Sequence, residues 1–285
     1  MNQPPSNLGK VYLVGAGPGA ADLITVRGAN LLAKANIVLH DALVDPEMLN
    51  LCPQAEKVAV GKRCERLSSA QAFINKRLID AAQKHQVVIR LKGGDPMLFG
   101  RADEEIQALR DAGIEVEVVP GITAALAGAA SLQQSLTLRG LSRSVAFVTL
   151  AQAASESSTN TSNSSHQEPL KPISNPSADT MVYYMGRKDA ARIANQLIAQ
   201  NPHFNKTTPV HILEAVSTKR ERLWSSTLGE LANGKADQWF DSSSPALIMI
   251  GEALRDKDDQ SESSSPEIND GLKNTQVLTN SRRSA

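Results

Sequence analysis

Glycine-rich loops are the first places where this sequence could do chemistry. Residues 15–20 (GAGPGA) follow the apolar run 10–14 and fit the spacing G-x-G-x-x-A of dinucleotide-binding loops. In such loops, backbone N–H groups at a helix start bind a pyrophosphate. Asp41 follows the next apolar run, where a dinucleotide site has its acidic residue. A nicotinamide-dependent oxidoreductase is therefore one hypothesis.

Two features weaken that hypothesis. Pro18 removes a backbone N–H from the loop that should bind the pyrophosphate. A second glycine loop, residues 92–96 (KGGDP), closes another strand of the same domain, and a dinucleotide-binding domain has no need of it. A third loop, residues 119–125, ends a further strand and opens a helix. Ligands of open α/β sheets lie beyond the carboxyl ends of the strands, so the three loops can line one cleft. In that cleft Asp95 could accept hydrogen bonds from hydroxyl or ammonium groups of a ligand.

The elements that must position these loops follow from hydrophobic periodicity. Strands alternate with helices, which predicts an α/β protein whose sheet is largely parallel and covered by helices. For the first half we expect strands at residues 10–14, 37–39, 57–60, 87–91 and 116–119, and helices at 22–35, 69–84 (with Ser69 as N-cap), 103–112 and 121–132. The pattern then restarts, with strands at 144–150, 180–185, 210–213, 220–225 and 246–250 and a helix at 189–200.

These elements predict two α/β domains, residues 9–120 and 121–254. Within the second domain, residues 151–178 are rich in serine and poor in apolar side chains. Such a stretch cannot bury enough surface to offset its ordering entropy, so we expect a flexible insertion. For the same reason we expect residues 255–285 to form a disordered tail.

Charge and hydropathy exclude several classes of protein. The 30 basic residues equal the 30 acidic ones, so no global field attracts nucleic acid or an anionic membrane. The sequence has no signal peptide and no apolar run of the ~18 residues that a membrane helix needs. Cys52 and Cys64 match no metal-ligand spacing. We therefore expect a cytoplasmic protein without a bound metal.

Six strings, in this order, resemble the tetrapyrrole methylase family and, within it, the uroporphyrinogen-III C-methyltransferases. They are VYLVGAGPG (11–19), LKGGDPMLFGR (91–101), VVPGITAA (118–125), TLRGL (137–141), YYMGR (183–187) and SPALIMIGE (244–252). The resemblance covers residues 9–254 apart from the serine-rich insertion. It implies two α/β domains with S-adenosylmethionine (SAM) in the cleft between them.

The implied reaction is the conversion of uroporphyrinogen III to precorrin-2 by two successive methylations, in sirohaem and corrinoid biosynthesis. The methyl donor SAM would leave as S-adenosylhomocysteine. The family also suggests a homodimer. We expect no extra N-terminal domain and hence neither dehydrogenase nor ferrochelatase activity on precorrin-2.

The resemblance also assigns roles to individual residues. The positions that match the family's cofactor-binding residues are Pro18, Gly93, Gly94, Asp95, Leu98, Thr123, Ala124, Met185, Val216 and Ala246. Asp41 and Lys62 match its proposed acid–base pair; the alternatives are a loop-capping carboxylate and a solvated surface lysine.

The carboxylates of a uroporphyrinogen need cationic partners, and arginine binds carboxylates in bidentate fashion. Our substrate-binding candidates are Arg63, Arg101 and Arg143. Further basic residues considered for this role are Arg66, Arg139 and Arg187. The alternative for each is an ordinary surface arginine.

The sequence departs from the family's usual residues mainly on the side expected to face the tetrapyrrole. The substituted positions are Ala20, Ala42, Leu67 and Leu138. They leave room for a later precorrin methyltransferase of the corrinoid pathway. Two further alternatives are the nicotinamide-binding oxidoreductase and a binding protein that kept the fold but lost catalysis.

Overall fold

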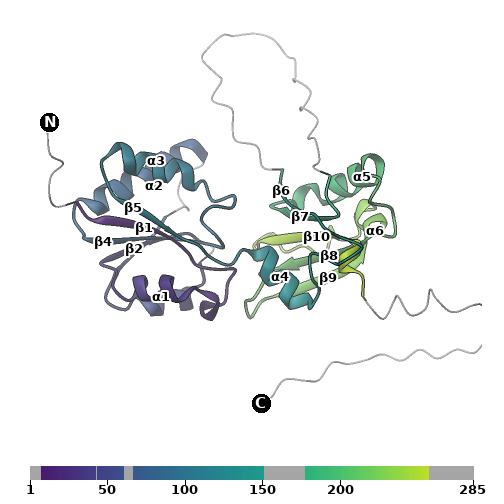
Figure 1. The fold of residues 1–285 in the computed structure, drawn as a ribbon, viewed down its shortest axis with the longest axis horizontal. Helices are drawn as coiled ribbons and strands as arrows, with labels where there is room; N and C mark the ends of the chain where they lie inside the picture. The colour runs from purple at the N-terminus through teal and green to yellow at the C-terminus, as the bar shows by residue number, and fades with distance from the viewer. Residues whose placement is uncertain (1–7, 43, 61–66, 151–176, 257–285) are drawn as a thin grey trace, which may run out of the picture. The chain divides into compact units, whose positions relative to one another are not determined.

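The chain forms two five-stranded sheets with helices on both faces of each (Figure 1). The structure is a computed structural model that describes residues 8–42, 44–60, 67–150 and 177–256. The α/β class predicted from the sequence is confirmed.

The first sheet is parallel at every strand pairing, in the order β3-β2-β4-β1-β5. Its strands are β1 (Lys10–Gly15), β2 (Ile37–His40), β3 (Glu56–Ala59), β4 (Val87–Lys92) and β5 (Val116–Val119). Since β1 lies between β4 and β5, the glycine loops that follow these three strands leave the sheet side by side. Asp41 follows β2, which pairs with β4, so it lies at the same carboxyl ends of the strands as the glycine loops.

Alternating side chains bury both faces of this sheet. Val11 and Leu13 pack in the core beneath α2 (Leu67–Ala82) and α3 (Ala102–Asp111). Val14 packs on the opposite face, beneath α1 (Val26–Leu32) and the 3-10 turn η2 (Pro46–Leu51). Figure 1 shows α2 and α3 on one side of the sheet and α1 on the other.

The second sheet is mixed, in the order β6-β7-β10-β8-β9. It comprises β6 (Val145–Thr149), β7 (Thr180–Tyr184), β8 (Pro209–Glu214), β9 (Arg222–Thr227) and β10 (Ala246–Gly251). Strands β6 and β7 are parallel, whereas the other pairings are antiparallel. Helices α5 (Ala190–Gln200) and α6 (Leu228–Ala232) pack on one face, and α4 (Ala124–Leu132) on the other.

Two local expectations were wrong. The helix expected at 22–35 is a short 3-10 turn, Ala21–Leu23, followed by α1, because Thr25 is extended and its side chain accepts from Gly28 N as an N-cap. Ser69 is not an N-cap, because α2 already begins at Leu67. Helix α6 and the turn η2 were not predicted.

The predicted domain boundary at residue 120 stays a prediction, as do the insertion and the tail. Residues 151–176 and 257–285 lie outside the described residues, whereas Ala178 is buried against the core of the second sheet. No helix in the described part of the chain is long and apolar enough to cross a membrane.

Candidate functional site

Three glycines, one from each loop, bring the loops after β1, β4 and β5 into backbone contact. A Cβ added at Gly121 would lie 2.3 Å from the carbonyl oxygen of Gly94 and 2.8 Å from Cα of Gly15. Gly94 N also donates to Gly17 O over 2.7 Å, and Gly17 N donates back to Gly94 O over 3.2 Å. Only glycine permits so close an approach, so the sequence fixes how these loops meet.

The carboxylate of Asp95 ties the second loop to the third. Its Oδ2 accepts a hydrogen bond from Gly121 N at 2.9 Å, and its Oδ1 accepts one from Met97 N at 2.8 Å. An ionised carboxylate has about four acceptor sites, so about two remain for a ligand. Asp95 is therefore a candidate ligand-binding group that also holds two loops together. This second, structural role could not be inferred from its position in the sequence.

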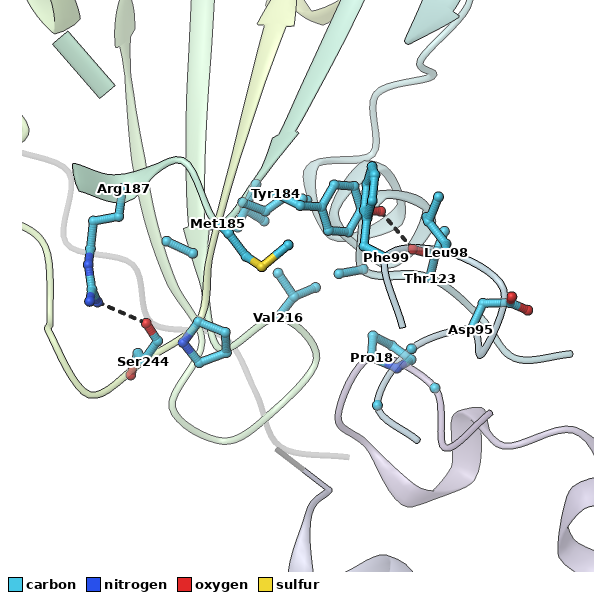
Figure 2. A pocket seen from close by; sticks show the side chains of 18 of the residues that line it. Pro18, Asp95, Leu98, Phe99, Thr123, Tyr184, Met185, Arg187, Val216 and Ser244 are labelled. Carbon is cyan, nitrogen blue, oxygen red and sulfur yellow. Dashed lines mark hydrogen bonds between the residues drawn. The ribbon is translucent and has the colours of Figure 1, made fainter. Parts of the chain in front are cut away.

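A pocket of about 450 Å³ opens against these loops (Figure 2). One wall consists of the glycine loops with Asp95 and Thr123, and it offers polar groups. The other wall comes from the second sheet and is mainly apolar, with Leu213, Val216 and Leu247 buried in it. Such a pocket suits a small-molecule ligand that has both polar and apolar parts.

All ten predicted cofactor-binding positions line this pocket: Pro18, Gly93, Gly94, Asp95, Leu98, Thr123, Ala124, Met185, Val216 and Ala246. Their role in cofactor binding stays a prediction. Sequence reasoning assigned no cofactor role to the other residues of the lining, which are Gly17, Phe99, Tyr184, Arg187, Lys188, Leu213, Ser244, Pro245 and Leu247. Of these, Gly17 belongs to a predicted glycine loop, and Arg187 is one of the basic residues considered for substrate binding. Tyr184 and Arg187 belong to the string YYMGR, which was the available signal for them.

Tyr184 joins the two walls of the pocket. Its hydroxyl lies 2.6 Å from Thr123 Oγ1 and accepts from Ala125 N over 3.1 Å, at the start of α4. Its ring lies against the rings of Phe99 and Phe147, with centroids 5.2 and 6.1 Å away. Burial raises the pKa of the Tyr184 hydroxyl, so the group stays neutral.

Arg187 shapes the wall of the pocket opposite the glycine loops. Its guanidinium donates to the carbonyl oxygens of Asp241, Ser242 and Ser244. These carbonyls belong to the loop at residues 241–244. In this loop, hydrogen bonds from the backbone N–H and hydroxyl of Ser243 and from the Ser244 hydroxyl lower the pKa of Asp241 to about 2. The contacts of Arg187 are thus with backbone carbonyls, in contrast to the carboxylate binding considered from the sequence.

The predicted catalytic pair is only partly described. Asp41 lies at the end of β2 with its side chain 31% exposed, and its Oδ1 is 2.5 Å from Arg90 Nη2. It does not belong to the pocket lining. Lys62 and the predicted substrate-binding residue Arg63 lie outside the described residues.

The other two substrate-binding candidates differ in position. Arg101 lies two residues after the pocket residue Phe99. It is the N-cap of α3 and has a left-handed backbone (φ 54°). Its side chain donates two hydrogen bonds to Glu104, at 2.6 and 2.7 Å. Arg143 is exposed and does not line the pocket, and its backbone N–H donates to Asp179. Among the described residues, no group of three His, Cys, Asp or Glu side chains could hold a metal ion.

Asp95→Ala should weaken binding of S-adenosylhomocysteine by ~1.5–3 kcal/mol, the usual scale for a hydrogen bond to a charged group. The loss of affinity has two sources: any direct contact of Asp95 with the ligand, and the hydrogen bond from Gly121 N that holds the third loop in place. Isothermal titration calorimetry measures it, with Asp111→Ala as the control, since the described contact of that carboxylate is with Gln107 on the same helix. An unchanged dissociation constant would reject both roles.

The fold and the pocket define an α/β protein with a cofactor-sized cleft lined by strand-end glycine loops. The pattern of the tetrapyrrole (corrin/porphyrin) methylases matches residues 10–232, and the chain belongs to this family.

Relatives and solved structures agree with this assignment. The chain is 40% identical over 252 residues to a uroporphyrinogen-III C-methyltransferase of Pseudomonas aeruginosa, covering 87% of this chain and 95% of the relative. It is 39% identical to a siroheme synthase of a Psychrobacter species, over 88% of this chain but 49% of the relative; the chain thus spans about half the length of such synthases. A Thermus thermophilus uroporphyrin-III C-methyltransferase complexed with S-adenyl homocysteine matches with a TM-score of 0.69 and 37% identity, over 87% of this chain and 94% of that one.

Proposed function

We propose that this chain is a SAM-dependent methyltransferase that converts uroporphyrinogen III to precorrin-2 by two successive C-methylations. The observation that carries the proposal is the convergence of all ten predicted cofactor positions on one pocket. The names of the Pseudomonas and Thermus relatives support the substrate, and the S-adenyl homocysteine of the Thermus complex supports the cofactor. We also propose a cytoplasmic location, from the sequence, and a homodimer, from the family resemblance.

The pocket has the groups that such a cofactor needs. The backbone of Gly93 and Gly94, with Asp95 and Thr123, would hold the polar amino-acid end of the cofactor, whereas the buried side chains of Leu213 and Leu247 would cover its adenosine end and exclude water. When bound, SAM supplies an electrophilic methyl group on a positive sulfur, and the protein contributes orientation and electrostatics. The ring carbon must approach in line, at roughly 3–3.5 Å from the methyl group.

Removal of a proton from the methylated ring system is the step that the protein assists most directly. Methylation leaves the ring positively charged, and because the methylated carbon already carries a carboxyalkyl group and has no hydrogen, the charge is lost when a neighbouring N–H or C–H of the ring system gives up its proton. Asp41 at the end of β2 stabilises this charge or accepts the proton, an effect of typically ~10²–10⁴-fold. Arg63, Arg101 and Arg143 bind the carboxylates of the tetrapyrrole, and Lys62 is the acid–base partner of Asp41.

The test is incubation with enzymatically generated uroporphyrinogen III and SAM, followed by mass analysis of the product. We expect a tetrapyrrole that carries two added methyl groups, with a singly methylated intermediate at early times. A later precorrin that is methylated while uroporphyrinogen III is returned unchanged would assign the chain to another step of the corrinoid pathway.

A further inference from the structure

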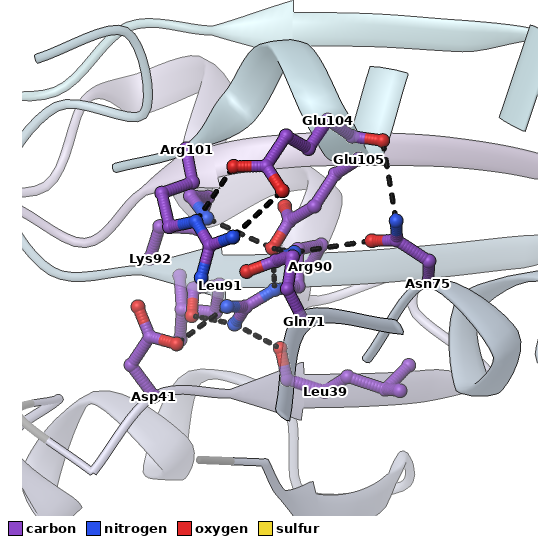
Figure 3. A network of polar contacts seen from close by, with 10 residues as sticks. All are labelled: Leu39, Asp41, Gln71, Asn75, Arg90, Leu91, Lys92, Arg101, Glu104 and Glu105. Carbon is purple, nitrogen blue, oxygen red and sulfur yellow. Dashed lines mark hydrogen bonds and ion pairs between the residues drawn. The ribbon is translucent and has the colours of Figure 1, made fainter. Parts of the chain in front are cut away.

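A cluster of charged side chains is buried between the first sheet and helix α3 (Figure 3). Alternation along β4 places Arg90 on the same face of the sheet as Val88, toward α2 and α3. Arg90 and Lys92 are 2% and 3% exposed, and Glu105 of α3 is fully buried. Charged residues are almost never buried so completely unless they are paired.

Glu105 holds the two cations through a single oxygen atom. Its Oε1 accepts from Arg90 Nε at 3.1 Å, from Lys92 Nζ at 3.0 Å and from Gln71 Nε2 at 3.3 Å. Its Oε2 is buried and has no hydrogen-bond partner among the described residues. Burial, together with the Arg90 guanidinium, lowers the pKa of the Lys92 ammonium. An incompletely satisfied buried cluster is a poor source of stability, so its geometry calls for another explanation.

The other edge of the Arg90 guanidinium faces the candidate catalytic carboxylate. Nη2 donates to Asp41 Oδ1 at 2.5 Å, and Nη1 donates to Leu91 O at 3.2 Å. A planar guanidinium presents its donors in a rigid fork. With Nε bound to Glu105, the position of Nη2 is set, and so is the place of the Asp41 oxygen that it binds. Figure 3 shows Arg90 between Asp41 and Glu105.

We infer that Arg90, held by Glu105, is a positioning residue that fixes the carboxylate of Asp41 at the end of β2 for removal of the proton from the methylated ring. The inference rests on the proposed function, because it assumes that Asp41 acts on the tetrapyrrole. Lys92 directly precedes Gly93 of the pocket loop, so Glu105 anchors the start of that loop as well. One buried carboxylate thus sets the place of both the cofactor loop and the acid–base group.

A double-mutant cycle between Arg90→Lys and Asp41→Asn tests this inference. Lysine keeps the charge but loses the fork, so Arg90→Lys should lower kcat for methylation of uroporphyrinogen III by ~10-fold or more and leave the KM for SAM within about two-fold. In the Asp41→Asn background the same change should lower kcat by less than about two-fold, because Arg90 then has no carboxylate to place. Arg192→Lys, at an exposed arginine paired with Asp189, is the matched control and should keep wild-type values.

The cycle separates positioning from general damage to the fold. If the two reductions in kcat multiply, Arg90 does not act through Asp41 and the inference is overturned. Should Arg90→Lys fail to fold, Arg90→Gln takes its place in the same cycle, because it removes the guanidinium fork and leaves the ion pair of Glu105 with Lys92 intact. If the wild-type protein itself gives no methylated uroporphyrinogen, the proposed function fails and the inference falls with it.

Discussion

Replacing Asp41 with asparagine is expected to lower turnover by at least ~10²-fold while the affinity for S-adenosylhomocysteine stays within a few-fold. Asparagine keeps the size of the side chain and an oxygen that can accept from Arg90, but it removes the negative charge that the methylated ring requires. Asp41 lies outside the pocket lining, which is why cofactor binding should survive. Single-turnover methylation and calorimetric titration of the same variant measure the two quantities.

The alternative role of Asp41 as a loop-capping carboxylate makes a different prediction. Asparagine caps nearly as well as aspartate, so turnover would then change little. Normal turnover in Asp41→Asn would remove the residue from the catalytic site. Loss of turnover together with loss of cofactor binding would instead assign it to the cofactor site or to folding.

Gly121→Ala is expected to weaken binding of S-adenosylhomocysteine by about 10- to 100-fold, since forcing extra atoms into packed structure costs roughly 1–3 kcal/mol. The added Cβ would lie 2.3 Å from Gly94 O, 2.8 Å from Gly15 Cα and 3.0 Å from Gly15 C, all of them backbone atoms. The loops after β1, β4 and β5 would have to move apart, and the polar wall of the pocket would open. Titration calorimetry gives the affinity, and thermal unfolding shows whether the variant is folded.

Gly113→Ala is the matched control for this prediction. Gly113 has φ +71° with nothing within 4 Å of an added Cβ, so alanine there introduces backbone strain without a clash in the pocket. We expect some loss of stability and an unchanged affinity for S-adenosylhomocysteine. Equal affinities for both variants and the wild type would show that the contact of the three glycines does not shape the cofactor site.

The glycine loops could be predicted because residue type alone carries their signal. Glycine and proline at strand ends, with Asp95 between them, mark a backbone that must approach a ligand or another loop. The strand order then brings the loops together, and parallel strands in a helix-covered sheet follow from the alternation of apolar runs. The family resemblance added individual predicted cofactor positions, such as Met185 in the string YYMGR and Val216 in the segment after β8.

The apolar wall of the pocket could not be predicted in the same way. Leu213 and Leu247 lie on neighbouring strands β8 and β10, directly opposite each other, but in the sequence each is one apolar residue in a buried strand. Whether such a residue faces a helix or a pocket depends on the sheet partner and on the face. The role of Tyr184 could not be predicted either, because its hydrogen bond with Thr123 joins residues that lie 61 positions apart in the sequence.

The buried charges on β4 show a second limit. The string VVIRLK predicts a strand, and its Arg90 and Lys92 suggest an exposed edge. In the structure both side chains face α3, where each forms an ion pair with Glu105. Glu105 is one of three acidic residues in the first turn of α3. Acidic residues are common there because they interact favourably with the helix dipole, so the sequence gives no reason to expect a basic partner for Glu105. The pairing becomes visible only when α3 is placed on the sheet.

The central claim, that the pocket at the glycine loops is the methyl-donor site, is tested most directly by calorimetric titration of the wild-type protein with S-adenosylhomocysteine and, separately, with NAD. The account predicts saturable binding of S-adenosylhomocysteine that Gly121→Ala weakens, and no saturable binding of NAD. Binding of NAD at micromolar concentration without detectable binding of S-adenosylhomocysteine would contradict the account and favour the dinucleotide interpretation of residues 15–20.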